Sequence, residues 1–94
     1  MGQISRVLHY HGVATTGFES FARGIGAAIR RARERAEVTQ EDAAHEADLS
    51  LRHYQLLESG KGANATLRSL YAIAKALNTT VAQLVSDGDA KRRL

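Results

Sequence analysis

Two polar side chains, Arg52 and Gln55, fall on one side of a short stretch whose other side is apolar. At about 100° per residue of a helix, Tyr54 and Leu57 point together toward a core, so the two polar side chains face away from it. A guanidinium can donate hydrogen bonds to O6 and N7 of guanine, and the amide of a glutamine can form two hydrogen bonds with adenine. Both side chains are also common on solvated surfaces. Taken alone, this helix leaves base reading and a plain solvated face as open interpretations.

The flanking residues predict two short helices, over 40–47 and 51–59, joined by a tight turn. Thr39 precedes an acidic first turn, which is typical of a helix start. Asp48 lies in the turn, where its side chain tolerates a left-handed backbone. Ser50 has the side chain of an N-cap for the second helix. Such a pair lets the second helix project while the first braces it.

Three further helices are expected around this pair. An apolar stripe at three- and four-residue steps predicts a helix from Phe18 to near Ala36, weakened in its first half by glycines. Thr66 begins a fourth helix and Thr80 a fifth. Five short helices with brief connections predict an all-α fold, a compact five-helix domain spanning residues 18–86.

The two ends of the chain lack this regularity. Residues 1–17 show no helical period, and we expect a flexible or loosely docked N-terminal arm. Residues 87–94 are expected to form a basic C-terminal tail. Along the fifth helix, Val81, Leu84 and Val85 form either a dimer surface or the closure of the core.

Composition limits the classes of protein that fit. A chain of 94 residues makes one domain, and its net charge of +3 permits a nucleic-acid partner without demonstrating one. It contains no cysteine, which excludes disulfides and thiol chemistry and fits the cytoplasm. Apolar stretches fall short of the roughly 20 residues of a membrane span, so we expect no membrane contact. Residues 39–60 carry one arginine against five acids, so basic neighbours must attract any phosphate.

Signals for catalysis and for cofactors are lacking. The sequence has neither a glycine-rich phosphate cradle nor an acid pair with a plausible cleft, so we expect no enzyme and no cofactor. His9 and His11 are a pair, whereas a metal site usually needs three or four ligands. We therefore expect no physiological metal. No segment that would bind a small-molecule effector is evident in the sequence either.

A longer pattern resembles the Cro/Xre-type helix-turn-helix family between Ile29 and Val85. It covers well over half of the chain, in order and at the expected spacing, although Asp48 stands where the family usually has glycine. The matching residues are Ile29-Arg30, Arg33, Thr39-Gln40-Glu41-Asp42, Ala44, Ser50, Tyr54, Leu57-Glu58, Gly60-Lys61, Thr66-Leu67, Leu70, Ile73-Ala74-Lys75-Ala76-Leu77, Val81 and Leu84.

The resemblance implies a lambda-repressor-like domain that regulates transcription by binding double-stranded DNA, and we expect it to act as a homodimer. It also implies that Gln40 contacts a phosphate and braces the second helix, and that Arg33 and Glu58 form an internal ion pair. The expected base-contacting residues are Leu51, Arg52, Gln55 and Leu56. The expected phosphate-contacting residues are Gln40, Ser50, His53, Lys61 and Arg68.

Two apolar residues on the reading face allow another function. Leu51 and Leu56 can touch thymine methyl groups, or they can form a patch that binds protein. The alternative is therefore a helical protein-interaction module, such as an antitoxin-like partner, that has kept the fold.

Overall fold

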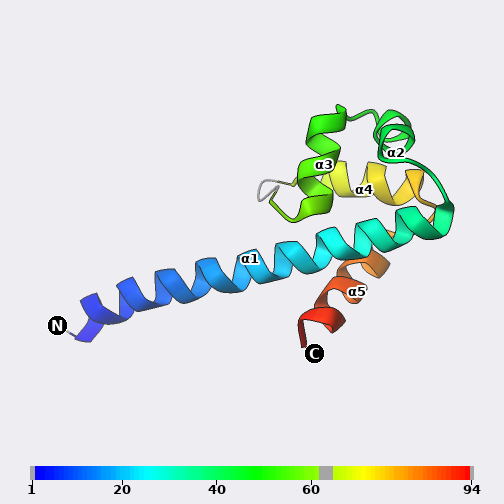
Figure 1. Cartoon of the computed structure of the whole chain (residues 1–94). Coiled ribbons are helices and arrows are strands. Elements are labelled where there is room, and N and C mark those ends of the chain that lie inside the picture. The colour runs from blue at the N-terminus through cyan, green and yellow to red at the C-terminus, as the bar shows by residue number, and fades with distance from the viewer. Residues whose placement is uncertain (1, 62–64, 94) are drawn as a thin grey trace.

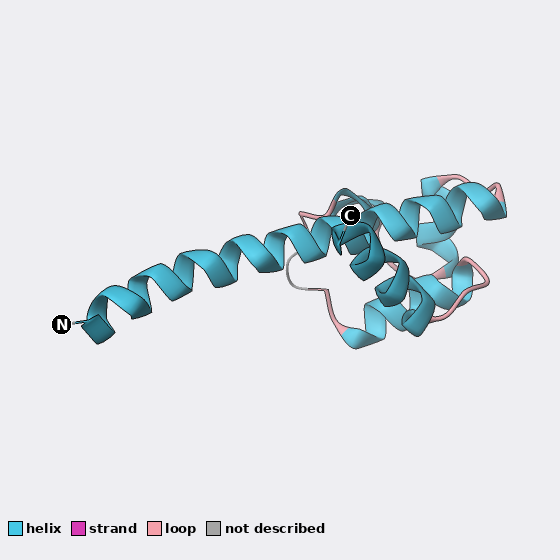
Figure 2. Cartoon of the chain, turned by 90° about the horizontal axis from the view of Figure 1, so that it is seen from below, coloured by secondary structure: helices cyan, strands magenta, loops and turns pink. Residues whose placement is uncertain are grey.

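The computed structural model describes residues 2–61 and 65–93 of the chain, and every regular element in those ranges is a helix (Figure 1). The five helices are α1 (Gly2–Ala36), α2 (Gln40–Glu46), α3 (Leu51–Ser59), α4 (Leu67–Ala76) and α5 (Val81–Arg93). The all-α architecture and the number of helices agree with the sequence prediction. Helices α2, α3 and α4 lie on one side of the C-terminal half of α1, and α5 lies on its other side (Figures 1 and 2).

Helix α1 is much longer than expected. It runs for 35 residues, and its N-terminal half projects from the other helices in both views (Figures 1 and 2). At 1.5 Å per residue its length is about 52 Å, which accounts for the 53 Å long dimension of the molecule. Residues 2–17, for which the sequence shows no helical period, are therefore helical, and the expectation of a flexible or loosely docked arm stays a prediction. Lengthening an existing helix adds one hydrogen bond per residue without a new nucleation cost, and no proline interrupts it.

Helix α5 also continues past the point where a polar tail was expected, since residues 87–93 are helical. Gly88, inside this segment, lies directly against Gly24 of α1. A methyl group on Gly24 would come within 2.6 Å of the Gly88 carbonyl oxygen. The two backbones touch where neither residue has a side chain, and this contact fixes the C-terminal half of α5 on α1.

The core is built mainly from small and branched apolar side chains supplied by all five helices. Leu84 of α5 is 1% exposed, and Val81 and Val85 pack against the same cluster. These three side chains close the core, which was one of the two expectations for them. The buried cluster consists of Ile25, Ala28, Ile29, Ala32, Ala43, Ala44, Ala47, Tyr54, Leu57, Ile73, Ala74, Leu77 and Leu84.

The turn between α2 and α3 is set by local chemistry. Asp48 has a φ of 59°, the left-handed conformation expected from the sequence. Its N–H donates to the carbonyl of His45, and the N–H of Leu49 donates back to Ala44 over 2.9 Å, as in a Schellman motif. Ser50 then caps α3 by accepting a 3.0 Å bond from the N–H of His53. Asp48 and Leu49 thus end α2, and Ser50 begins α3.

A second close backbone contact lies on the opposite side of α1. A methyl group on Gly26 would stand 2.5 Å from the Glu58 carbonyl oxygen and 2.8 Å from the Gly60 nitrogen. Gly24 and Gly26, which both lower helix propensity, are therefore the positions where α5 and the end of α3 approach the backbone of α1. Packing, and not local propensity, accounts for both residues.

We predict that Gly24→Ala and Gly26→Ala each lower the free energy of unfolding by about 1–3 kcal/mol, because neighbouring backbone must move. Gly17→Ala is the matched control, since nothing lies within 4 Å of its added methyl group. It should stabilise the helix, by up to about 1 kcal/mol. Urea denaturation of the three variants measures the difference. A gain in stability at position 24 or 26 would contradict the close contacts.

Candidate nucleic-acid interface

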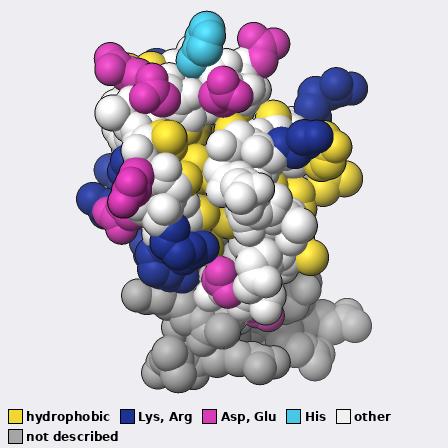
Figure 3. Space-filling model, turned by 90° about the vertical axis from the view of Figure 1, so that its right-hand side faces the viewer, with side chains coloured by type: hydrophobic (Ala, Val, Ile, Leu, Met, Phe, Trp, Pro, Cys, Tyr) yellow, Lys and Arg dark blue, Asp and Glu magenta, His cyan; other side chains and the backbone are white. Residues whose placement is uncertain are grey.

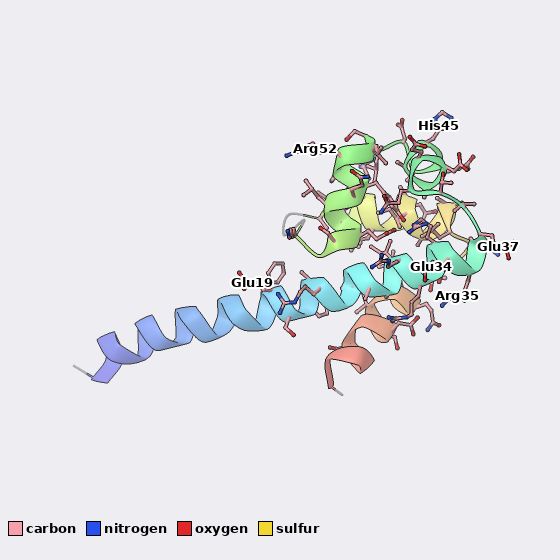
Figure 4. The ribbon with its side chains drawn as sticks, viewed as in Figure 1. Glu19, Glu34, Arg35, Glu37, His45 and Arg52 are labelled. Atoms are coloured by element: carbon pink, nitrogen blue, oxygen red, sulfur yellow. The ribbon has the colours of Figure 1, made fainter. Side chains whose placement is uncertain are left out.

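Helix α3 presents a distinct outer face. Arg52, Gln55, Leu56 and Ser59 are exposed, and Leu51 is half-buried. Figure 4 shows Arg52 extending from α3 away from the other helices. The expected alternation of a buried and an outward face is therefore present, and the outward face is open along the length of the helix.

The inner face of α3 carries a buried carboxylate. Glu58 is only 8% exposed, and four donor atoms surround it. Arg33 donates through Nε to Oε2 over 2.8 Å and through Nη2 to Oε1 over 3.1 Å. The Tyr54 hydroxyl donates to Oε2 over 2.7 Å, and Gln40 Nε2 donates to Oε1 over 2.8 Å. Helices α1, α2 and α3 thus meet at one side chain.

The ion pair that the family resemblance implied is present. Arg33 and Glu58 are bonded through both carboxylate oxygens, and their side chains are 16% and 5% exposed. A third bond runs from Arg33 Nη1 to the carbonyl of Val38, in the turn between α1 and α2, over 3.0 Å. Arg33 therefore joins the end of α1, the following turn and the end of α3.

The surroundings of Glu58 change the ionisation of the cluster. Burial acts to raise the pKa of Glu58, but the bonds from Arg33, Tyr54 and Gln40 outweigh it and lower the pKa below its ordinary value. Burial and the bond to Glu58 raise the pKa of the Tyr54 phenol. The bond to Glu58 raises the pKa of Arg33. At neutral pH the cluster is therefore a carboxylate held by a guanidinium and a neutral phenol.

Gln40 connects this cluster to the outer face. Its Nε2 donates to Glu58, and its Oε1 accepts a 3.1 Å bond from Gln55 Nε2. Together with Leu51 and neighbouring residues, both glutamines line a shallow hollow where α2 meets α3. Gln40 and Gln55 are 15 positions apart, and sequence reasoning missed the pair because no local pattern joins the two.

The expected phosphate-contacting residues lie in three places. Gln40 is at the hollow, and Ser50 is exposed at the start of α3, where its oxygen caps the helix while its hydroxyl hydrogen remains to donate. His53 is half-buried in the first turn of α3. Lys61 is exposed just after α3, and Arg68 is exposed in the first turn of α4. Ser50 and His53 thus lie together at the start of α3, Gln40 lies at the hollow beside Gln55, and Lys61 and Arg68 lie elsewhere.

An unexpected cation lies beside Lys61. Arg23 of α1 is exposed and borders the same surface hollow as Ser59, Gly60 and Lys61. A methyl group on Gly60 would stand 2.6 Å from the Arg23 Cα, so the chain passes closely over α1 at this point. The sequence alone assigned Arg23 no role. Its position beside α3 follows from the left-handed glycine that ends that helix.

The five acidic residues within positions 39–60 are distributed unevenly over the surface and the interior. Glu58, one of the five acids, is paired with Arg33. Figure 3 shows carboxylates and a histidine gathered at the end of the molecule that α2 forms. That view is from the side opposite to the direction in which Arg52 extends in Figure 4. Glu41 is an exception, since it lines the hollow beside Gln55.

The comparison with known families agrees with this geometry. A helix-turn-helix family model matches residues 29–84, which is more than half of the chain and includes α2, α3 and α4. The chain belongs to the Cro/Xre-type helix-turn-helix family, a family of DNA-binding domains. Searches among curated proteins and among solved structures give no match. Within residues 2–61 and 65–93, no helix is long and apolar enough to cross a membrane.

We predict that Arg33→Met lowers the free energy of unfolding by about 3–5 kcal/mol, because it leaves a buried carboxylate without its counter-charge. Arg30→Met is the matched control. Arg30 pairs with Glu34 at 3.8 Å, but both side chains are more than 60% exposed. Its loss should cost at most about 1 kcal/mol. Equal costs in urea denaturation would show that the buried pair is no stronger than a surface pair.

The lowered pKa of Glu58 also predicts a pH dependence. A carboxyl group whose pKa is lower in the folded state stabilises the fold above its unfolded pKa, about 4.3 for glutamate. This contribution is lost as the pH falls through the folded value. The difference in unfolding free energy between the natural protein and Glu58→Gln should therefore be constant from about pH 7 to pH 5 and shrink below about pH 4. A difference that grows on acidification would reverse the assigned direction.

Proposed function

We propose that the protein is a sequence-specific transcriptional regulator that inserts α3 into the major groove of double-stranded DNA. The observation that carries this proposal is the two-sided nature of α3. Its inner face is fixed by Tyr54, Leu57 and the Glu58 cluster, while Arg52 and Gln55 stand on an open outer face. A rigidly held helix with exposed polar side chains has the geometry that direct base readout needs.

The outer face offers donors, acceptors and apolar groups to base edges. Arg52 matches the two acceptors of guanine, and Gln55 matches the donor and acceptor of adenine. Leu56, which is 37% exposed, and the half-buried Leu51 supply apolar contact for thymine methyl groups. We assign these four side chains to base contact.

Phosphate contact falls to residues around this face. We assign it to Gln40, Ser50, His53, Lys61 and Arg68, of which only Lys61 and Arg68 are permanent cations. With Arg52 included, about three cations would release counterions, so the slope of log affinity against log salt should be about −2 to −3 per domain. The attraction to the DNA backbone is moderate, in line with the acidic balance of the motif.

We infer a homodimer on a near-palindromic site. One nine-residue helix reads only a few base pairs, so useful affinity calls for a second copy. Two-fold symmetry then places the half-sites about one helical turn, or 34 Å, apart along the duplex.

Selection of binding sites from randomised duplex DNA tests the proposal. A near-palindromic consensus, bound more tightly than mixed-sequence DNA at both low and moderate salt, is the expected result. Failure to enrich any sequence, together with negligible affinity at low salt, would refute DNA binding. It would favour the protein-interaction module acting through Leu51 and Leu56.

We predict that Arg52→Ala relaxes the base preference at one position of each half-site and costs roughly 1–3 kcal/mol on the preferred sequence. Arg35→Ala is the matched control, because Arg35 lies near the C-terminal end of α1, away from the direction in which Arg52 extends (Figure 4). It should leave both affinity and preference unchanged. Titration of each variant against the preferred duplex and against single-base variants gives the two readouts. An equal loss on all sequences would assign Arg52 to phosphate contact alone.

A further inference from the structure

The sequence of the N-terminal half of α1 gives weak support to a helix that stands alone. Residues 2–17 contain three glycines and five β-branched residues, which lower helix propensity, and a single charged residue, Arg6. This half nevertheless projects from the other helices in both views (Figures 1 and 2). Among the described residues, nothing lies within 4 Å of a methyl group added to Gly17. Helical segments of this length are marginal in water without packing, so we expect a partner to cover this one.

The apolar stripe of the core continues into this projecting half. Residues 2–17 show no helical period when they are read alone. Steps of seven residues back from the buried Ile25 lead to Phe18 and to positions 11 and 4, which share one face of the helix. Positions 7, 8, 14 and 15 flank that line, and none of the positions on this face carries a charge. We call this set the α1 face, and it consists of Ile4, Val7, Leu8, His11, Ala14, Thr15 and Phe18.

The described end of the α1 face is open to solvent. Phe18 is one of only two phenylalanines in the chain, yet its side chain is 47% exposed. Together with Phe21 and with Leu70 of α4, it lines an apolar groove where α1 leaves the other helices. Exposed apolar surface of this kind marks an interaction site. A partner that covers the α1 face therefore also reaches this groove.

The order of residues along the α1 face matches a reversed copy of itself. Position 11 lies midway between positions 4 and 18, seven residues from each, and it places a histidine between two large apolar residues. In an antiparallel pair centred on position 11, histidine lies opposite histidine, and Ile4 of each copy lies opposite Phe18 of the other. A polar residue within an apolar seam selects a register of this kind. Because the α1 face carries no charge, two copies do not repel each other there.

The positions of α3 and α4 decide the direction of the pair. Both helices lie on one side of the C-terminal half of α1 (Figure 1), where Ile29 meets them on the stripe that continues as the α1 face. A parallel copy in register would place its own α1 where they stand. An antiparallel copy begins with Gly2 opposite Ser20, before Gly60 passes over Arg23. The two helices then overlap over residues 2–20, about 28 Å.

We propose that the N-terminal half of α1 is a self-association surface, on which the same half of a second copy packs antiparallel with position 11 at the two-fold axis. This inference goes beyond the proposed function, because it names a surface that joins two copies, and it does not depend on DNA binding. Each copy contributes the seven residues of the α1 face, fewer than the about 20–30 residues per side of a standard interface. The dimer should therefore dissociate on dilution.

Sedimentation equilibrium of the whole chain over a concentration series, without DNA, measures the association. Val7→Glu places a charge on the α1 face, and Val13→Glu is the matched control, because position 13 lies on the other side of the helix. We expect the natural protein and Val13→Glu to approach the mass of two chains. Val7→Glu should raise the dissociation constant of the dimer by at least about a hundredfold, because two charges would be buried. Thermal unfolding verifies that each variant keeps its fold.

Introduced cysteines test the direction and the register, because the chain has none of its own. In the proposed pair, position 11 lies opposite itself, so His11→Cys should form an intermolecular disulfide under mild oxidation. Position 4 lies opposite position 18. Ile4→Cys should therefore cross-link to Phe18→Cys when the two proteins are mixed, but not to a second copy of itself. A parallel pair would give the opposite result for Ile4→Cys.

Three results would overturn the inference. They are a natural protein that stays monomeric over the whole series, equal dissociation constants for Val7→Glu and Val13→Glu, and efficient cross-linking of Ile4→Cys to itself. If residues 2–17 contact DNA instead, Val7→Glu lowers the affinity for DNA while every variant stays monomeric, which also overturns it. None of these outcomes bears on site selection by α3, so failure of this inference is distinguishable from failure of the proposed function.

Discussion

The placement of α3 depends on one buried carboxylate. Taking Glu58 out of water carries a large desolvation cost, and only a full set of donors offsets it. Arg33, Tyr54 and Gln40 come from three different helices and supply that set. Because each bond has a narrow range of length and angle, satisfying Glu58 restricts how the three helices can be placed relative to one another. The cluster therefore specifies where α3 stands as well as contributing stability.

The glycine contacts and the charged cluster reinforce one another. Gly26 lets α1 approach the backbone of Glu58 and Gly60 within van der Waals range, and the Arg33 side chain, seven residues further along α1, then reaches the carboxylate. A larger residue at position 26 would push the end of α3 outward and lengthen the ion-pair bonds. The small core side chains serve the same end, because alanine faces allow short interhelical distances. Close packing is thus a condition for the polar network.

The sequence predicted those features that local chemistry decides. The bounds of α3, the caps at Thr39 and Ser50 and the left-handed turn at Asp48 each depend on residues within one turn of one another, and all appear in the structure. The Arg33–Glu58 pair, 25 residues apart, followed only from the family resemblance. The contact of Gln40 with Gln55 was missed, because it depends on how separate helices pack.

The helices at the two ends of the chain were not predicted for a related reason. Helix propensity in residues 2–17 and 87–93 is unremarkable. In the structure both segments continue helices that are already anchored in the core, so each added residue gains a hydrogen bond without a nucleation cost. Gly88 shows the limit of propensity most directly. It was taken for part of a tail, yet its lack of a side chain is what lets α5 lie on α1.

The charge balance explains how a motif with a net charge of −4 over residues 39–60 is compatible with a polyanionic partner. Glu58 is neutralised within the fold, and most of the other carboxylates gather at the α2 end, away from the direction of Arg52. What remains near α3 is a small number of cations and several neutral donors. Such a surface gains little binding free energy from counterion release, so its sequence-independent affinity for DNA is weak. Under the proposed function, selectivity must then come from directed hydrogen bonds at the base edges, and these require side chains whose orientation is set before binding. Gln55 is held in this way, because it bonds Gln40, which in turn bonds the buried carboxylate of Glu58.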